Sequence, residues 1–255
     1  MVERGSTSPV RPTESSAAEA TTCAQARLIP TAMVVGFLGS GKTTLLRRMA
    51  QTAGTRRLMF LVNEFSSADV DGRLVRMEGA DVIALPGGSI FCRCLTTALM
   101  DSLARIARRT RERPVDGLVV EASGLADPRV ARDVLRELGL DQVFVLRSVV
   151  AVADARRVVR LARTLPVLRA QIEAADLVLL NKCDLATPAD IETAEAWIRS
   201  VRPYVDLRRC VRAETDADLF SLTAAPRSVH GEWAPARSPM FVTLELVPPR
   251  PTDLS

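Results

Sequence analysis

The chain has 255 residues, of which 47% are hydrophobic and 25% are charged, and its formal net charge is +4. This length is sufficient for one substantial domain with a large core. The longest apolar stretch, residues 143–153, is interrupted by Arg147 and Ser148, so no segment approaches the roughly 20 residues of a membrane-spanning helix. We therefore expect no membrane anchor.

The N-terminal residues 1–30 mix Ser, Thr, Pro and Ala with acidic residues and contain no apolar signal core. This composition predicts a disordered tail and argues against secretion or import into an organelle. The chain has five cysteines, and an odd number does not suit the disulfide framework of a secreted domain. We therefore expect a cytoplasmic protein whose thiols are unpaired or bound to metal.

The basic residues are almost all arginines, because Lys42 and Lys182 are the only lysines in the chain. They lie within the short segments 36–44 and 181–184, at positions where a compact ammonium group is useful. The arginines within residues 105–113 indicate the solvated face and end of a helix in preference to a phosphate-backbone site. We expect no nucleic-acid partner.

Short β-branched runs alternate with longer helical patterns over residues 31–224, which is typical of a parallel sheet with helices on both faces. The runs 117–121 and 177–180 lack polar alternation, as expected for strands buried on both faces. The predicted strands are 33–37, 58–62, 82–85, 117–121, 149–153, 177–180 and 207–211, and the predicted helices are 42–53, 95–111, 131–138, 155–163 and 188–201. The sequence therefore predicts an α/β fold with a mostly parallel central sheet.

The C-terminal residues 225–255 have a different pattern, in which prolines surround a single alternating strand at 241–246. One strand cannot form a domain. This end is therefore an appended edge strand, or the remnant or start of a second domain.

Residues 36–44 follow an apolar strand and open a helix, which is the context in which a P-loop pattern predicts a nucleotide site. Its glycines allow backbone N–H groups and the helix N-terminus to face phosphates. We expect Lys42 to reach the β- and γ-phosphates and the Thr43 hydroxyl to bind Mg²⁺. The predicted phosphate-binding residues are Gly36, Gly39, Ser40, Gly41, Lys42, Thr43 and Thr44. An ordinary glycine-rich turn is the alternative interpretation.

A second motif, Asn181-Lys182-Cys183-Asp184, follows the apolar run 177–180 directly. The Asp184 carboxylate can accept two hydrogen bonds from the N–H groups of guanine, whereas adenine presents the wrong groups. Charge-assisted bonds contribute roughly 1.5–3 kcal/mol each, so the discrimination is large. The P-loop and this motif together predict a GTP site.

A third motif begins where a buried strand ends in Glu121, followed three residues later by Gly124. A carboxylate at a strand end can hold Mg²⁺, and the Gly124 N–H can sense the γ-phosphate. Asp127 and Pro128 also predict a helix N-cap with proline at the first helical position. Both interpretations can hold at once.

These motifs resemble the CobW-like branch of the CobW/HypB/UreG family of P-loop GTPases. Beyond the P-loop, the resemblance rests on residues 62–65, 121–128, 152–155 and 171–185. It implies an α/β GTPase that dimerises or docks on a client in its GTP state and uses hydrolysis to deliver or gate a metal or a metallocofactor. The resemblance also makes Glu64 a candidate carboxylate for positioning water or for contact with the metal, beside Lys42, Glu121 and Gly124 as catalytic residues.

Two departures from the family pattern concern hydrolysis and metal binding. Ser66 and Ser67 follow Phe65, where CobW-like proteins usually have Gly-Glu, so hydrolysis is expected to be slow. The family's Gly-Cys-x-Cys-Cys motif is rewritten, leaving Cys92 and Cys94. These two thiolates could share Zn²⁺ or another soft metal if a dimer supplied further ligands, or they are two ordinary thiols.

The leading hypothesis is a GTPase that assists insertion of a metal or metallocofactor into a client protein. The alternative is a GTP-dependent docking module for a corrinoid or other cofactor enzyme, with no metal transfer of its own. A small-molecule kinase is disfavoured because the motif at 181–184 selects guanine and no acceptor site is visible.

Overall fold

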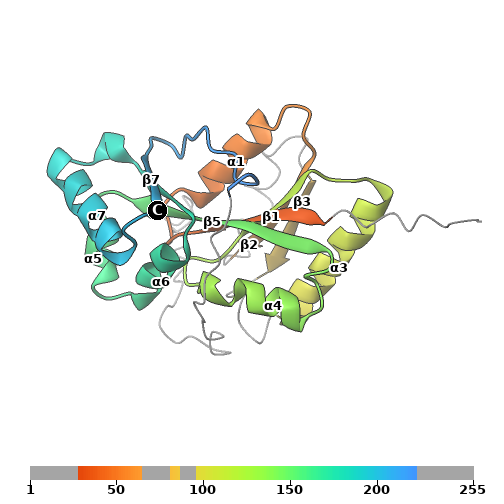
Figure 1. Ribbon diagram of the computed structural model, residues 1–255. Helices are drawn as coiled ribbons and strands as arrows, with labels where there is room; N and C mark the ends of the chain where they lie inside the picture. Colours follow the sequence, from red (N-terminus) through yellow and green to blue (C-terminus); the bar gives the residue numbers. More distant parts are fainter. Residues whose placement is uncertain (1–27, 65–80, 87–95, 223–255) are drawn as a thin grey trace, which may run out of the picture.

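The computed structural model describes residues 28–64, 81–86 and 96–222, which form a layered α/β structure around one sheet (Figure 1). The strands are β1 Ile29–Val35, β2 Leu58–Glu64, β3 Asp81–Pro86, β4 Gly117–Glu121, β5 Phe144–Asp154, β6 Leu177–Asn181 and β7 Asp206–Arg209. The helices are α1 Lys42–Thr52, α3 Thr96–Glu112, α4 Ala131–Glu137, α5 Val158–Ala162, α6 Pro166–Ala174 and α7 Pro188–Val201, with 3₁₀ turns η2 Pro128–Val130 and η3 Cys183–Leu185.

The seven described strands form one parallel sheet in the order β3-β2-β4-β1-β5-β6-β7. The prediction of a mostly parallel sheet is confirmed. Every residue of β4 and β6 is buried, which explains why these strands lack polar alternation. Because parallel strands end at the same edge of a sheet, the segments that follow β1, β4 and β6 lie together there.

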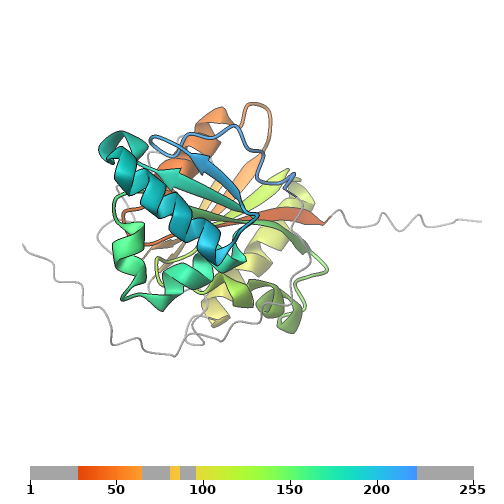
Figure 2. The same cartoon turned by 60° about the vertical axis from the view of Figure 1, so that its left-hand side comes forward.

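The two faces of the sheet are covered differently. Helices α3 to α7 contribute apolar side chains to the core on one face, among them Ile106, Ile172 and Ile198. On the other face, α1 and the segment 210–222 pack on the sheet through residues such as Leu46 and Leu219. Figure 1 and Figure 2 both show α1 and the blue segment 210–222 on the same side of the sheet. Helices therefore cover both faces, as predicted.

The end of the segment 210–222, at Leu219 and Phe220, packs on the sheet near the N-terminal ends of the strands. Thr31 pairs with Leu146 and Ala32 with Ser148, so Arg147 is an extra, bulged residue of β5. The buried Ser148 hydroxyl donates a hydrogen bond of 2.6 Å to Leu219 O. The following residue, Phe220, packs so closely on Gly117 that a Cβ there would overlap its ring.

The structure differs from the predicted boundaries in several places. Strand β1 begins at Ile29, inside the predicted tail 1–30, and β5 begins five residues before the predicted 149. Helix α5 starts at Val158 and not at 155, because the Asp154 side chain accepts a hydrogen bond from Arg156 N and holds a turn there. Helix α6 was not predicted, and β7 ends at Arg209 and not at 211.

Some predictions concern residues that the structure does not describe. The strand at 241–246 and the rest of 225–255 lie outside the described residues, as do residues 1–27. None of the described helices is long and apolar enough to cross a lipid bilayer.

A core substitution tests the packing of the central sheet. Leu179 in β6 is fully buried, so Leu179→Ala should lower the free energy of unfolding by about 2–5 kcal/mol through lost burial and a cavity. Urea unfolding followed by circular dichroism measures the change. Tyr204→Ala is the control, because Tyr204 is 99% exposed and its truncation should change stability by less than about 0.5 kcal/mol. Equal stability of the two variants would contradict the predicted packing.

Candidate functional site

A cavity of about 900 Å³ lies at the edge of the sheet where β1, β4 and β6 end. It is bordered by most of the residues that the sequence predicts as a nucleotide site. Those residues are Gly39, Gly41, Lys42, Thr43, Thr44, Glu121, Gly124, Asn181, Lys182 and Asp184. Gly36 and Ser40 lie behind them, against β5, α5 and α6, where they line a much smaller cavity of about 20 Å³. The structure thus brings the three motifs together.

The loop between β1 and α1 adopts the conformation that its glycines allow. Gly36, Gly39 and Gly41 have φ angles of 142°, 73° and 117°, a region that residues with a Cβ rarely adopt. A Cβ at Gly36 would overlap Val152 O, and one at Gly41 would overlap the Asn181 amide. Alanine at either position would therefore be strained and would collide with its neighbour.

Helix α1 begins at Lys42, and no described side chain caps its first turn. The helix dipole favours an anion at this end of α1. The Lys42 ammonium is buried and donates a hydrogen bond of 2.8 Å to Gly36 O, across the loop. The positive charge of Lys42 and the N-terminus of α1 therefore lie at the same place.

Oxygen ligands meet beside this loop. The Thr43 hydroxyl donates to Glu121 Oε1 at 3.3 Å, and Glu121, the last residue of β4, is only 6% exposed. Asn63, which is also 6% exposed, borders the same cavity from the end of β2. Hydroxyl, carboxylate and amide oxygens are the ligands that Mg²⁺ accepts, directly or through water.

The side chain of Asn181 joins the phosphate loop to the other end of the cavity. Its Nδ2 donates to Ser40 O at 2.8 Å, and its Oδ1 accepts from Ala213 N at 2.8 Å. Lys182, with a φ angle of 63°, donates to Gly39 O and to Asp154 Oδ2, the latter at 2.9 Å. Asn181 and Lys182 thus have structural contacts with the phosphate loop, whereas Asp184 is exposed and borders the cavity.

The sequence did not indicate the part that residues 210–214 play. Arg212 borders the cavity, and both Arg212 and Ala213 have positive φ angles, 50° and 55°. Arg48 on α1 holds this turn by donating from Nε to Arg212 O at 2.9 Å and by an ion pair with Glu214 at 3.5 Å. Neither residue is glycine, so the sequence carries no local signal for this turn.

Two described thiols, Cys183 and Cys210, lie in or beside the motif at 181–184. Burial raises the pKa of the Cys210 thiol to about 12, and burial also raises the pKa of Cys183, whose N–H donates to Cys210 O at 3.2 Å. Both thiols therefore stay protonated near neutral pH and are poor nucleophiles and metal ligands.

Within residues 28–64, 81–86 and 96–222, no three His, Cys, Asp or Glu side chains cluster as a metal site. Cys92 and Cys94 lie outside the described residues, and Glu64 is described only as the last residue of β2.

The loop after β4 begins a helix as predicted, with one difference. Asp127 is the N-cap and accepts a hydrogen bond from Arg129 N at 3.0 Å, with Pro128 in the first position. The first turn is the 3₁₀ turn η2, and α4 follows at Ala131.

Comparisons with known proteins agree with this geometry. A family model described as the nucleotide-binding domain of CobW/HypB/UreG matches residues 30–208. The chain belongs to this family of P-loop GTPases. It is 32% identical over 202 residues to a protein named zinc chaperone CobW from Sinorhizobium sp, covering 68% of this chain and 56% of that relative.

Two further relatives come from Escherichia coli. The chain is 31% identical over 169 residues to the zinc chaperone YeiR of strain K12, covering 66% of this chain and 50% of YeiR. The crystal structure of Zn(II)-bound YjiA GTPase matches with a TM-score of 0.52 and 25% identity, covering 78% of this chain and 62% of YjiA. The chain spans about half the length of the curated relatives it matches.

An isosteric substitution tests the Asn181 bridge. Asn181→Asp replaces the donor to Ser40 O by a carboxylate oxygen in a buried place, so it should lower the free energy of unfolding of the nucleotide-free protein by about 1–3 kcal/mol. Urea titration measures it. The reverse exchange at the exposed Asp184, Asp184→Asn, should stay within about 0.5 kcal/mol of the parent. A parent-like Asn181→Asp variant would show that the bridge contributes little.

Proposed function

We propose that this protein binds GTP with Mg²⁺, hydrolyses the GTP, and uses this cycle to assist insertion of a metal or metallocofactor into a client protein. The observation that carries the nucleotide part is the single cavity of about 900 Å³ bordered by both the phosphate loop and the motif at 181–184. This volume lies within the roughly 300–1,000 Å³ of small-molecule sites.

The phosphates would bind at the loop between β1 and α1. Backbone N–H groups of Gly39, Gly41, Lys42, Thr43 and Thr44 would donate to phosphate oxygens, with Gly36 allowing the turn. The Ser40 N–H would exchange its hydrogen bond to Phe37 O for a phosphate oxygen. The Lys42 ammonium would exchange its hydrogen bond to Gly36 O for the β- and γ-phosphate oxygens. Glycine is required at 36 and 41 because a Cβ would collide with β5 or with Asn181, and it is favoured at 39 by a φ angle of 73°.

The magnesium site would be formed by Thr43 and Glu121, whose oxygens are 3.3 Å apart. A hydroxyl beside a buried carboxylate at the end of a strand fits a hard cation. Bound Mg²⁺ would neutralise negative charge on the phosphates during hydrolysis. Gly124, on the same edge of the cavity, would offer its N–H toward the γ-phosphate, and Glu64 would position the attacking water.

Guanine would bind at the other end, where Asp184 and the turn at Arg212 border the cavity. The Asp184 carboxylate would accept from two N–H groups of guanine. Asn181 and Lys182 would keep the base end aligned with the phosphate loop through their bonds to Ser40 O and Gly39 O.

The metal part of the proposal rests on the family. Relatives of this chain are named zinc chaperones, so we extend to it a role in handling zinc or another transition metal, with Cys92 and Cys94 as candidate ligands. A GTP-dependent homodimer would bring two such pairs together, which suits a tetrahedral site of four ligands. The proposal includes a cytoplasmic location, a P-loop GTPase domain over 31–224 and a separate C-terminal segment from 225.

The choice of base gives one test. With Mg²⁺ present, GTP should raise the melting temperature and ATP should not. Asp184→Ala should weaken GTP binding by at least about tenfold, because charge-assisted bonds contribute roughly 1.5–3 kcal/mol each. Thermal-shift assays and calorimetric titration measure both effects. Asp141→Ala, at an exposed position outside the cavity, should bind GTP as the parent does. Equal protection by ATP and GTP would contradict the guanine site.

Metal uptake gives a second test. Reduced protein, with and without GTP, should bind Zn²⁺, Co²⁺ or Ni²⁺ more tightly than the Cys92→Ser, Cys94→Ser variant, because thiolates are the preferred soft ligands. Competition with a chromophoric chelator measures the affinity, and Cys23→Ser serves as the control. If the double variant binds these metals as tightly as the parent, the metal-transfer role is wrong, and the docking-module alternative takes its place.

A further inference from the structure

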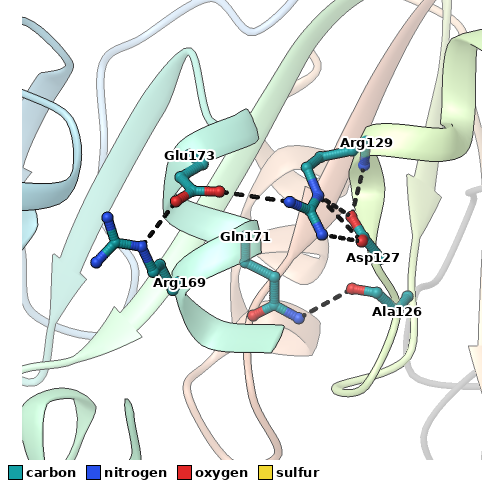
Figure 3. Close-up of polar contacts among 6 residues, drawn as sticks. All are labelled: Ala126, Asp127, Arg129, Arg169, Gln171 and Glu173. Carbon is teal, nitrogen blue, oxygen red and sulfur yellow. Dashed lines mark hydrogen bonds and ion pairs between the residues drawn. The ribbon is translucent and has the colours of Figure 1, made fainter. Parts of the chain in front are cut away.

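One buried side chain on α6 holds the loop that follows β4. Gln171 is 2% exposed, and its Nε2 donates to Gly124 O at 3.1 Å and to Ala126 O at 3.2 Å. Figure 3 shows its amide directed from α6 to the loop at Ala126. Both protons of this amide group are thus used on the backbone of one turn, which is closed by a bond of 3.0 Å from Ala126 N to Ser123 O.

These two bonds set the orientation of the peptide groups in the loop. A trans peptide is planar, so the C=O of one residue and the N–H of the next point in opposite directions. With Gly124 O drawn toward α6, the N–H of Leu125 is directed away from α6. Gly124 and Leu125 both border the nucleotide cavity. Gln171 therefore orients the peptide group between Gly124 and Leu125 at the border of this cavity.

A second set of contacts ties the far end of the same loop to α6. Arg129 binds the Asp127 carboxylate, with a shortest distance of 2.6 Å, and its Nη1 lies 3.5 Å from Glu173 Oε2 (Figure 3). Arg202 Nη1 donates to Glu173 O at 2.9 Å and so holds the end of α6 in turn. The loop is thus attached to α6 at Gln171 and again at Glu173.

The chain that follows α6 is fixed to the sheet immediately before β6, the strand that leads to the motif at 181–184. Asp176 N donates to Val149 O at 2.7 Å, and Val149 N donates to Asp176 Oδ2 at 2.9 Å. Strand β6 begins at the next residue and ends at Asn181. A fixed helix can hold a loop in one conformation, whereas a mobile helix would move with it.

We propose that Gln171 is a positioning residue for GTP hydrolysis. Its amide holds the loop 122–127 in the conformation that presents N–H groups to the γ-phosphate. This inference rests on the proposed GTPase function. It predicts that loss of Gln171 affects the state with a γ-phosphate and spares the GDP state, because only the γ-phosphate adjoins this loop.

Two substitutions at Gln171 test the proposal. Gln171→Leu keeps most of the buried volume and removes both donors, and Gln171→Glu keeps the shape and turns acceptors toward the two carbonyl groups. Both should lower kcat for GTP by at least about tenfold, as expected for two lost hydrogen bonds near the reacting group. GDP affinity should stay within about twofold of the parent. Single-turnover hydrolysis and calorimetric GDP titration measure these values.

A matched control separates this effect from loss of stability. Ile172→Val on the same helix trims a core side chain that is 2% exposed and touches none of the loop bonds. It should lower stability, and its kcat should remain that of the parent. Parent-like kcat in both Gln171 variants, or an equal loss of GDP and GTP binding, would overturn the positioning role.

Other outcomes distinguish this inference from the proposed function. If the parent binds GTP without hydrolysing it, the enzymatic function is wrong. The role of Gln171 is then tested by the affinity for a non-hydrolysable GTP analogue divided by the affinity for GDP, compared between the parent and the two variants. This ratio should fall at least about tenfold in both variants. A parent that binds no guanine nucleotide overturns both proposals.

A measurement on the unmodified protein does not depend on the folding of any variant. Amide hydrogen exchange of Leu125 should slow with the GTP analogue and not with GDP. Equal exchange in the two nucleotide states would overturn the proposal.

Discussion

The nucleotide cavity depends on the side-chain amide of Asn181, which is used at both ends. It donates to the phosphate loop at Ser40 O and accepts from the turn at Ala213 N, so three segments far apart in the sequence meet at one group. The amide also restricts position 41 to glycine, because a Cβ there would overlap Asn181. The side of the cavity at the P-loop and the side at residues 210–214 are therefore held by the same side chain.

The segment from Gln171 to Asn181 connects two of the loops at this edge of the sheet. Apolar residues of α6 and β6, such as Leu168 and Leu179, belong to the core and provide the stability. The polar residues at the two ends of this segment hold loops in place. Gln171 holds the loop after β4, and Asn181 holds the phosphate loop. A short stretch of chain thus positions two of the loops that border the cavity.

Local signals account for most of what could be predicted from the sequence. The P-loop, the motif at 181–184 and the buried strands are recognisable because glycine spacing and apolar runs are properties of short segments. Helix α6 was missed because nine residues between two other elements give little periodic signal. The start of α5 depends on a side-chain bond from Asp154, and the bulge at Arg147 depends on pairing with β1.

The turn at Arg212 and Ala213 could not be predicted from the sequence either. Positive φ angles at residues other than glycine are imposed by tertiary contacts, here from Arg48 and Asn181. The role of Gln171 is of the same kind, because its partners are backbone carbonyl groups 47 and 45 residues away. Such contacts appear only when the fold has brought the elements together.

The distribution of amines in this chain has a practical consequence. Lys42 and Lys182 are its two lysines, and each donates to a backbone carbonyl of the phosphate loop. Apart from the terminal α-amino group, every aliphatic amine thus borders the nucleotide cavity. Acetylation of a lysine side chain in this sequence, chemical or enzymatic, therefore modifies a residue that borders this cavity.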